Sequence, residues 1–167
     1  MELIFEIRDS NQHFRNNLIL AQGAFDPVFA VTTYTNYSSS DYNGFHLNPG
    51  KPDSFEWNSP PFEVSADFHG TPATRRYRTL AEYSDATGQD RHSVLLDYDV
   101  FQKVTPPDRS DPQRVYVHDG FDFRLRPGSA AVDKGTLLPM ITDGFTGRAP
   151  DLGAYELDRP MFHYGPR

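Results

Sequence analysis

The sequence predicts an all-β protein, built mostly of short strands and ordered loops with one short helix. Its acidic residues are 17 Asp against 6 Glu, and its basic residues are 13 Arg against 3 Lys. Glu and Lys fill the solvent-facing side of helices, whereas Asp, together with the 14 Pro and 12 Gly, favours turns and strand ends. The 13 Phe and 9 Tyr supply large rings, so a folded core is expected despite the few aliphatic residues.

Composition also limits the class of protein. The 167 residues suit one domain, and the absence of cysteine excludes disulfide scaffolds, zinc-cysteine sites and cysteine nucleophiles. A net charge of −7 argues against a nucleic-acid partner, which needs clustered Lys and Arg. No apolar run approaches the ~20 residues of a membrane span, so no membrane partner is expected. The first six residues, MELIFE, show no export signal because they carry acid where a basic region is required.

The first 47 residues contain four strand candidates, separated by turn residues that include the stretch 36–41. They are residues 3–7, Phe14 with 18–20, 28–34 and 42–47. Asn17 and Asn43 each precede a strand candidate at an interval of 26 residues. That interval fits one coil of a parallel β-solenoid with stacked Asn turns, or an ordinary antiparallel sheet with Asn-rich turns.

The middle of the chain is expected to be a Pro- and aromatic-rich loop over 48–78, followed by a helix over 80–87. Thr79 and Glu82 form a capping box at the start of that helix, and Gly88 is a natural stop. Strands are predicted over 93–101, 115–117 and 121–125, with a loop over 104–114. The tail from Pro127 is too rich in Gly and Pro to form its own core, so we expect it to wrap back over the rest.

Two stretches of the tail, DFRLRPGSAAVDKG over 122–135 and DGFTGRAPDLGAYE over 143–156, carry a resemblance to a known family. They resemble the C-terminal end of secreted right-handed parallel β-helix proteins of the pectate-lyase-like superfamily, which includes polysaccharide lyases and glycoside hydrolases. Residues 77–94 look like the segment that precedes this end, and the resemblance covers roughly 36–167. The chain departs from the family at Ala130, where Pro is usual, and at Asp97-Tyr98, where Asp-Pro is usual.

The resemblance implies the last coils of a right-handed parallel β-helix: coils over 1–47, loop, helix and strand over 48–101, and a capping tail over 102–167. The family's enzymes carry eight or more coils, whereas this chain has room for about two. It therefore looks like part of a longer extracellular or cell-surface precursor, completed by missing N-terminal coils or by self-association. The expected function is to act on or bind polysaccharide without a complete catalytic set. The alternatives are a non-catalytic polysaccharide-binding or surface-attachment module and a purely structural cap.

Three residues are candidates for catalysis. His92 could serve as a general base or contact a sugar; the alternative is a hydrogen-bonded structural histidine. Asp97 and Asp99 would alternate onto one face of the predicted strand, about 7 Å apart. That placement suits Ca²⁺ or an acid/base pair, and the alternative is that both carboxylates cap turns or face solvent.

Arginines beside aromatic rings are the candidates for substrate binding. Arg75, Arg76 and Arg78 could hold a uronate carboxylate while Trp57 or Tyr77 stacks on the sugar. The alternative is that these arginines lie over packed rings.

The tail also carries Asp133, Arg148, Asp151 and Glu156, which we expect to form an internal Arg-carboxylate network, with a metal site as the alternative. His46 and His69 have no partner at ligand spacing, so neither indicates a function.

Overall fold

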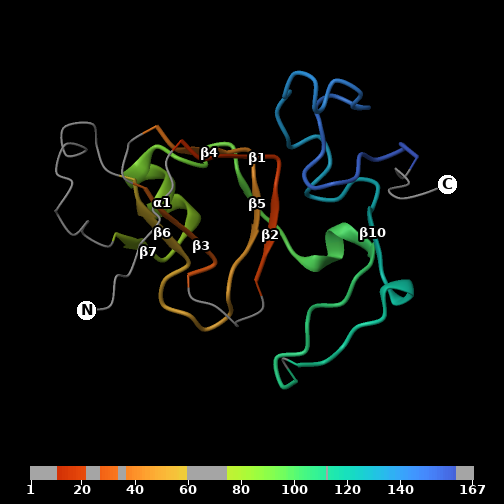
Figure 1. Cartoon of the computed structure of the whole chain (residues 1–167), viewed down its shortest axis with the longest axis horizontal. Helices are drawn as coiled ribbons and strands as arrows, with labels where there is room; N and C mark the ends of the chain where they lie inside the picture. The colour runs from red at the N-terminus through yellow and green to blue at the C-terminus, as the bar shows by residue number, and fades with distance from the viewer. Residues whose placement is uncertain (1–10, 22–26, 34–36, 60–74, 112, 161–167) are drawn as a thin grey trace, which may run out of the picture.

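The computed structural model describes residues 11–21, 27–33, 37–59, 75–111 and 113–160. In these ranges the chain forms short strands and a single α-helix, which confirms the all-β prediction (Figure 1). The strands are β1 (His13–Arg15), β2 (Leu18–Leu20), β3 (Phe29–Thr32), β4 (Ser39–Asp41), β5 (Gly44–His46), β6 (Phe55–Asn58), β7 (Arg76–Tyr77), β8 (Val94–Leu95), β9 (Phe101–Lys103) and β10 (Asp122–Leu125). The helix α1 is Leu80–Thr87, and two 3₁₀ helices are η2 (Tyr98–Val100) and η3 (His118–Gly120).

Three pairs of strands share one parallel register. β1 pairs with β4, β2 with β5 and β3 with β6, and each residue faces one 26 positions farther along the chain. Figure 1 shows the members of each pair side by side. The strands at the Asn17–Asn43 interval are therefore parallel, not antiparallel.

The regular register ends after these two turns of the chain. β8 adds to β5 in parallel, but its residues lie 50 positions beyond their partners, because the segment after β6 carries β7 and α1. β7 runs antiparallel to β6. The next strand beside β5 is thus β8, which has only two residues, and the next strand beside β6 is β7, which runs in the opposite direction.

Helix α1 forms as predicted. The Thr79 hydroxyl accepts a hydrogen bond from the Glu82 N–H at 3.1 Å, and the Glu82 carboxylate accepts from the Arg78 N–H at 3.1 Å. The second hydrogen bond of the capping box therefore comes from Arg78, the residue before the N-cap, and not from Thr79 itself. Gly88 ends the helix with φ 74°, and its N–H donates to the Ser84 carbonyl.

The first of two hydrophobic clusters is a column of aromatic rings beneath α1. Phe29 contacts Phe45 at 5.5 Å, Phe45 contacts Phe55 at 5.2 Å, and Phe55 stacks on Tyr83 of α1 at 4.9 Å. Ring pairs of this kind contribute about 0.5–1.5 kcal/mol each beyond their buried area. The cluster joins rings of the segments 1–47 and 48–101, so these two expected segments share one core.

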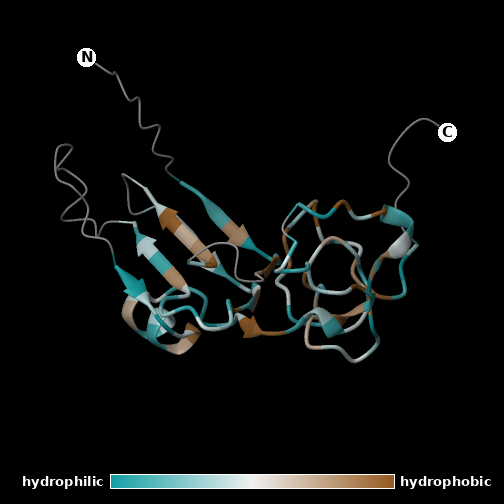
Figure 2. Cartoon of the chain, turned by 90° about the horizontal axis from the view of Figure 1, so that it is seen from below, coloured by the Kyte–Doolittle hydropathy of each residue, from teal (hydrophilic) through white to brown (hydrophobic). Residues whose placement is uncertain are grey.

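The second cluster joins the tail to β2. Val100, Phe101, Leu125 and Leu152 are buried together, with Leu18 of β2 packed against them. Gly153 (φ 95°) donates its N–H to the Asn16 carbonyl at 2.7 Å. The tail thus packs back on the first strands, as predicted, and Figure 2 shows its irregular path beside the strands.

Several predicted elements differ in the structure. β4 lies in the stretch 36–41 that was expected to be turn, and β6 and β7 lie in the expected loop 48–78. Residues 93–101 do not form one strand, because the Asp97 carboxylate accepts from the Tyr98 N–H and starts η2. Val115 and Val117 are exposed and form no strand with any described segment.

Two further predictions concern a strand near the N-terminus and the absence of a membrane span. The strand predicted over 3–7 lies outside the described residues. The described helix is too short to cross a membrane.

Candidate functional site

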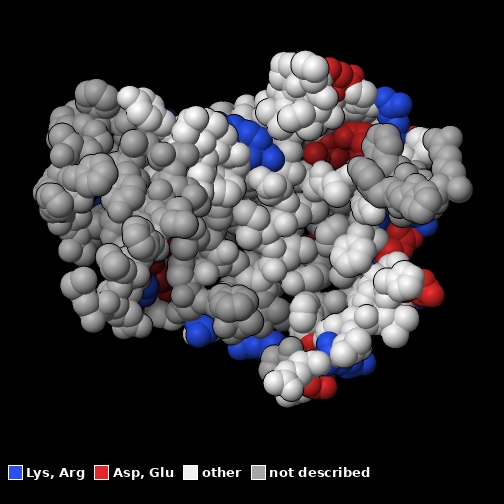
Figure 3. All heavy atoms as spheres, in the orientation of Figure 1, with Lys and Arg blue, Asp and Glu red and all other residues white. Residues whose placement is uncertain are grey.

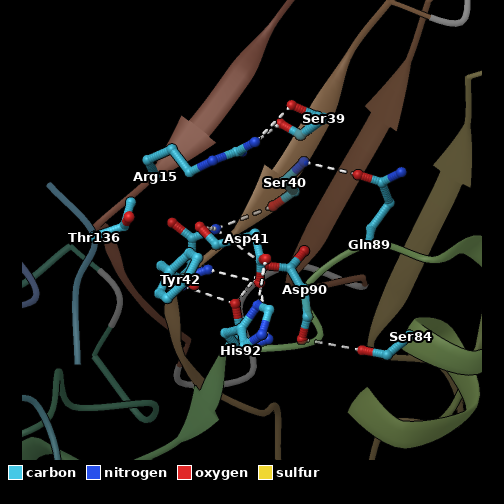
Figure 4. A network of polar contacts seen from close by, with 12 residues as sticks. Arg15, Ser39, Ser40, Asp41, Tyr42, Ser84, Gln89, Asp90, His92 and Thr136 are labelled. Carbon is cyan, nitrogen blue, oxygen red and sulfur yellow. Dashed lines mark hydrogen bonds and ion pairs between the residues drawn. The ribbon is translucent and has the colours of Figure 1, made fainter. Parts of the chain in front are cut away.

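The first candidate is a carboxylate-histidine pair on the turn that precedes β5. The Asp41 carboxylate lies 2.7 Å from the His92 Nδ1 and also accepts from the His92 N–H at 2.8 Å. The His92 ring stacks on Tyr42 with a centroid distance of 4.7 Å (Figure 4). Asp41 ends β4 and His92 precedes β8, so the pair joins two successive turns of the chain.

The electrostatics of this pair favour an ionised Asp41. Partial burial acts to raise the pKa of Asp41, but hydrogen bonds from the His92 ring, the His92 N–H and the Tyr42 N–H outweigh burial and lower it. Because an ionised carboxylate only accepts, Nδ1 of His92 carries the proton. The side chain of His92 is 60% exposed, which leaves Nε2 open to a ligand. The pair can therefore act as a base or accept a hydroxyl hydrogen bond.

Asp97 and Asp99 do not share a strand face, so the geometry expected for their acid/base pair or Ca²⁺ site is wrong. Asp97 caps η2, and its Oδ1 lies 3.5 Å from Nε2 of His46, while Asp99 is exposed within η2. The structure does not bring either residue into the Asp41–His92 pair. No group of three or more acidic or histidine side chains in the described ranges could hold a metal ion.

His46 has partners that its sequence context did not reveal. Its Nδ1 lies 2.6 Å from the Ala21 carbonyl, and its ring contacts Tyr98 edge-on at 5.4 Å. Two His-Asp pairs therefore flank the β5–β8 pairing, one at each end. His69 lies outside the described residues.

The predicted arginine and aromatic site is partly built into the fold. Arg75 donates its N–H to Asn58 and its guanidinium to the Ser59 carbonyl, while Arg76 pairs with Glu56 at 2.9 Å. Arg78 is exposed next to the helix cap.

The two rings proposed to stack on a sugar belong to the first hydrophobic cluster. Trp57 is only 4% exposed, so it presents no stacking face, and Tyr77 packs against the same cluster. This correction follows from the strand β6, whose alternation turns Trp57 inward.

The tail carboxylates form a network, but their partners are backbone N–H groups. Asp133 accepts from Arg148 N and Ala149 N, and Asp151 accepts from Asp133 N and Leu157 N. Glu156 accepts from the N–H groups of Thr146 and Asp151. Backbone hydrogen bonds from Arg148 and Ala149, and to a smaller extent the Arg148 charge, lower the pKa of Asp133. No close ion pair joins the Arg148 guanidinium to a described carboxylate, so backbone N–H groups rather than an arginine side chain hold the predicted network together.

The second candidate is a groove around Phe123, a half-exposed residue of β10 that sequence reasoning did not select. Three cavities of about 560, 400 and 240 Å³ share its ring as a wall. Tyr155 of the tail lines the two larger ones and a fourth of about 370 Å³. The three cavities that meet at Phe123 are called the Phe123 groove below.

Both hydrophobic and charged groups line the Phe123 groove. Arg15 and Asn17 border the 560 Å³ cavity, and Lys103 borders the 400 Å³ cavity. Arg124 hydrogen bonds to Asp122 and lowers the pKa of that carboxyl to about 2. In Figure 3, uncharged atoms cover the area between the strands and the tail.

Comparison of the chain with protein families, curated proteins and solved structures finds no match.

Proposed function

We propose that this chain is the closing C-terminal region of a right-handed parallel β-helix, that it acts outside the cell or at its surface, and that it binds polysaccharide in the Phe123 groove. The constant 26-residue register of three parallel strand pairs supports the fold. In a β-solenoid each coil repeats the turns of its neighbour and buries its inner face against it. The column of aromatic rings across successive strands fits that packing.

A repeated side-chain contact at one turn supports the same fold. Asn43 Oδ1 accepts from the Asn17 N–H at 3.0 Å, and one turn later Ser93 Oγ accepts from the Asn43 N–H at 2.7 Å. In each case a side-chain oxygen of the later coil accepts a hydrogen bond from a backbone N–H of the earlier coil. Such a rung fixes the register between coils, because each buried donor needs that partner.

The last coil has the features of a cap. β7 reverses direction against β6, and α1 places Tyr83 on Phe55 at the end of the ring column. An uncovered ring column and open strand edge would expose apolar surface and unpaired backbone groups. The reversed β7 and the stacking of Tyr83 on Phe55 therefore favour a second function, closure of the solenoid, which is compatible with sugar binding.

The meeting of three cavities at Phe123 is the observation that carries the polysaccharide proposal. A row of cavities that share a wall suits an extended polymer, and half-exposed rings such as Phe123 can stack on the apolar face of a sugar. Polar groups at the walls, such as Arg15 and Asn17, can hydrogen bond to the substituents of the polymer.

The test is retention of the purified chain on a panel of acidic and neutral polysaccharides by affinity electrophoresis. We expect retention that is lost in Phe123→Ala and in Tyr155→Ala, and kept in Val115→Ala, which removes an exposed apolar side chain outside the groove. Thermal melting monitored by circular dichroism shows whether each variant is folded. Retention lost instead in an Arg75→Ala/Arg76→Ala double variant would place binding in the arginine-rich segment and overturn the groove.

The same samples test catalysis and the cap function. Formation of unsaturated products, followed by ultraviolet absorbance and abolished in His92→Ala, would make the chain an enzyme rather than a binding region. Absence of retention on every polysaccharide, with a folded chain, would leave only the structural cap.

A further inference from the structure

The smallest cavity of the Phe123 groove differs from the others because none of its side chains is charged. This arm cavity, of about 240 Å³, lies between the segment after η2 and the segment that leads into β10. Its walls are apolar or aromatic. They are Tyr98, Val104, Pro107, Tyr116, Phe121 and Phe123, with Thr105 also in the lining.

The walls of the arm cavity are held in place by contacts with one another and with the surrounding loop. Tyr116 packs on Phe121 at 5.8 Å, and Phe121 packs on Phe123 at 5.9 Å. The Arg114 guanidinium lies 5.4 Å from the centre of the Tyr116 ring, and the Tyr116 hydroxyl accepts from the Asp108 N–H at 2.7 Å. The cavity is thus formed before any ligand arrives.

Two of the three hydroxyl groups in the lining, those of Thr105 and Tyr116, can donate to a ligand. The Tyr116 hydroxyl uses a lone pair for Asp108, which leaves its hydrogen available. The Thr105 hydroxyl makes no hydrogen bond with the part of the chain that is described. The Tyr98 hydroxyl points its hydrogen at the Leu20 carbonyl, 3.5 Å away. A group that only accepts hydrogen bonds and ends in an apolar atom suits two donors in an apolar wall.

We propose that the arm cavity binds an acetyl ester carried by a sugar. An acetyl group has a carbonyl acceptor, no donor and a methyl group, which matches the hydroxyls of Thr105 and Tyr116 and the surrounding rings. A free sugar hydroxyl would instead bury a donor among apolar walls, with loss of its bonds to water. The volume is below the ~300 Å³ at which pockets for whole ligands begin, so it fits a substituent while the rest of the sugar lies along the groove.

This inference rests on the proposed function for its choice of a carbohydrate ligand. Its test uses small glycosides, so that it is separate from retention on polysaccharide. Methyl α-glucoside and its tetra-acetate are titrated into the isotope-labelled chain, and amide chemical shifts are followed by nuclear magnetic resonance. We expect the tetra-acetate to bind at least about tenfold more tightly, with shifts concentrated at the amides of Val104, Thr105 and residues 116–123.

Variants separate a specific cavity from general adhesion of an apolar compound. Thr105→Val keeps the shape and removes one donor, so the preference for the acetate should fall by about threefold to tenfold. Phe121→Ala should abolish the localised shifts, whereas Val115→Ala on the same segment should leave them unchanged. Because Thr105 is exposed, its substitution should not affect folding and keeps the test valid if Phe121→Ala is unstable.

Three results would overturn the inference: equal affinity for the two glycosides, shifts spread over exposed apolar residues such as Met140 and Ile141, or an unchanged preference in Thr105→Val. Polysaccharide retention with equal affinity for the two glycosides would refute the acetyl site alone. Failure of retention together with a localised acetate preference would refute the proposed polysaccharide function instead.

Discussion

Replacement of Asn43 by alanine should destabilise the protein more than any other change at the repeated turn. Asn43 is fully buried. Its Oδ1 accepts from the Asn17 N–H and side-chain amide, at 3.0 and 2.9 Å. Its Nδ2 lies within 3.0–3.2 Å of four acceptors, which include the carboxylate of the buried Asp90 and the Ser40 hydroxyl.

The magnitude follows from how many of these bonds can exist together. An amide nitrogen has two hydrogens and its oxygen has two lone pairs, so Asn43 makes at most four hydrogen bonds at once. At roughly 1 kcal/mol each, their loss costs about 4 kcal/mol. The buried Asp90 carboxylate also loses a donor. Its Oδ2 already has no hydrogen-bond partner in the described chain, and its Oδ1 would keep only the Ser93 hydroxyl as a side-chain donor. We therefore expect a loss of about 4 kcal/mol.

Urea unfolding measures this loss, provided that the slope of free energy against urea is the same in both proteins. Asn17→Ala is the matched control, because the exposed Asn17 side chain donates one bond to the same oxygen and should cost about 1 kcal/mol or less. A cost for Asn43→Ala below about 2 kcal/mol, or one equal to that of Asn17→Ala, would refute the view that this buried amide holds the two successive turns of the chain together.

Three further changes test other parts of the structure. The Tyr83 hydroxyl is buried beside the Asp90 carboxylate, yet it makes no hydrogen bond of normal geometry with a described residue. Tyr83→Phe should therefore leave stability in urea unchanged or raise it by about 1 kcal/mol; a loss would mean that the hydroxyl donates to Asp90. The lowered pKa of Asp41 contributes stability that is present above the ordinary pKa of 3.8 and lost as pH falls through the lowered value, so Asp41→Asn should flatten the acid side of a stability-pH profile; an unchanged profile would contradict the pairing. Gly153→Ala forces a side chain onto φ 95° and into β2, and should lower stability by about 1–3 kcal/mol; an unchanged melting temperature would show that the tail does not need this contact.

Local signals in the sequence were enough to predict the helix and to mark the 26-residue interval that the strand register follows. The capping residues Thr79 and Gly88 act within a few positions of the helix, so their effect does not depend on the rest of the fold. The interval between Asn17 and Asn43 equals the register because the two residues lie side by side, each just before a strand of the parallel pair β2–β5. That interval did not decide between parallel and antiparallel pairing, since turn residues alone do not fix strand direction.

Predictions failed where tertiary contacts override local preference. Phe55 and Trp57 lie among prolines and were expected in a loop, but parallel pairing with β3 makes them part of a strand. Val115 and Val117 have strong strand preference, yet no described segment pairs with them, and a strand needs a partner for its backbone groups.

The candidate sites were hard to predict for the same reason. Phe123 and Arg15 line one cavity although they lie far apart in the sequence, because the tail crosses back over β2. His92 was selected from sequence, but its carboxylate partner is Asp41 rather than Asp97 or Asp99. Asp41 lies 51 positions before His92, at the end of β4, and only the strand register brings the two residues together.

The two His-Asp pairs explain how a strand as short as β8 stays paired with β5. Two residues of ladder supply few backbone bonds, and Leu95 is more than half exposed, so burial adds little. At one end His92 reaches Asp41, and at the other Asp97 lies beside His46, so each pair joins the segment of β8 to the segment of β5. The ring contacts of Tyr42 with His92 and of His46 with Tyr98 restrict both histidines further. Side-chain pairs therefore take over where the regular backbone register ends, and they position the segment from which η2, β9 and the Phe123 groove begin.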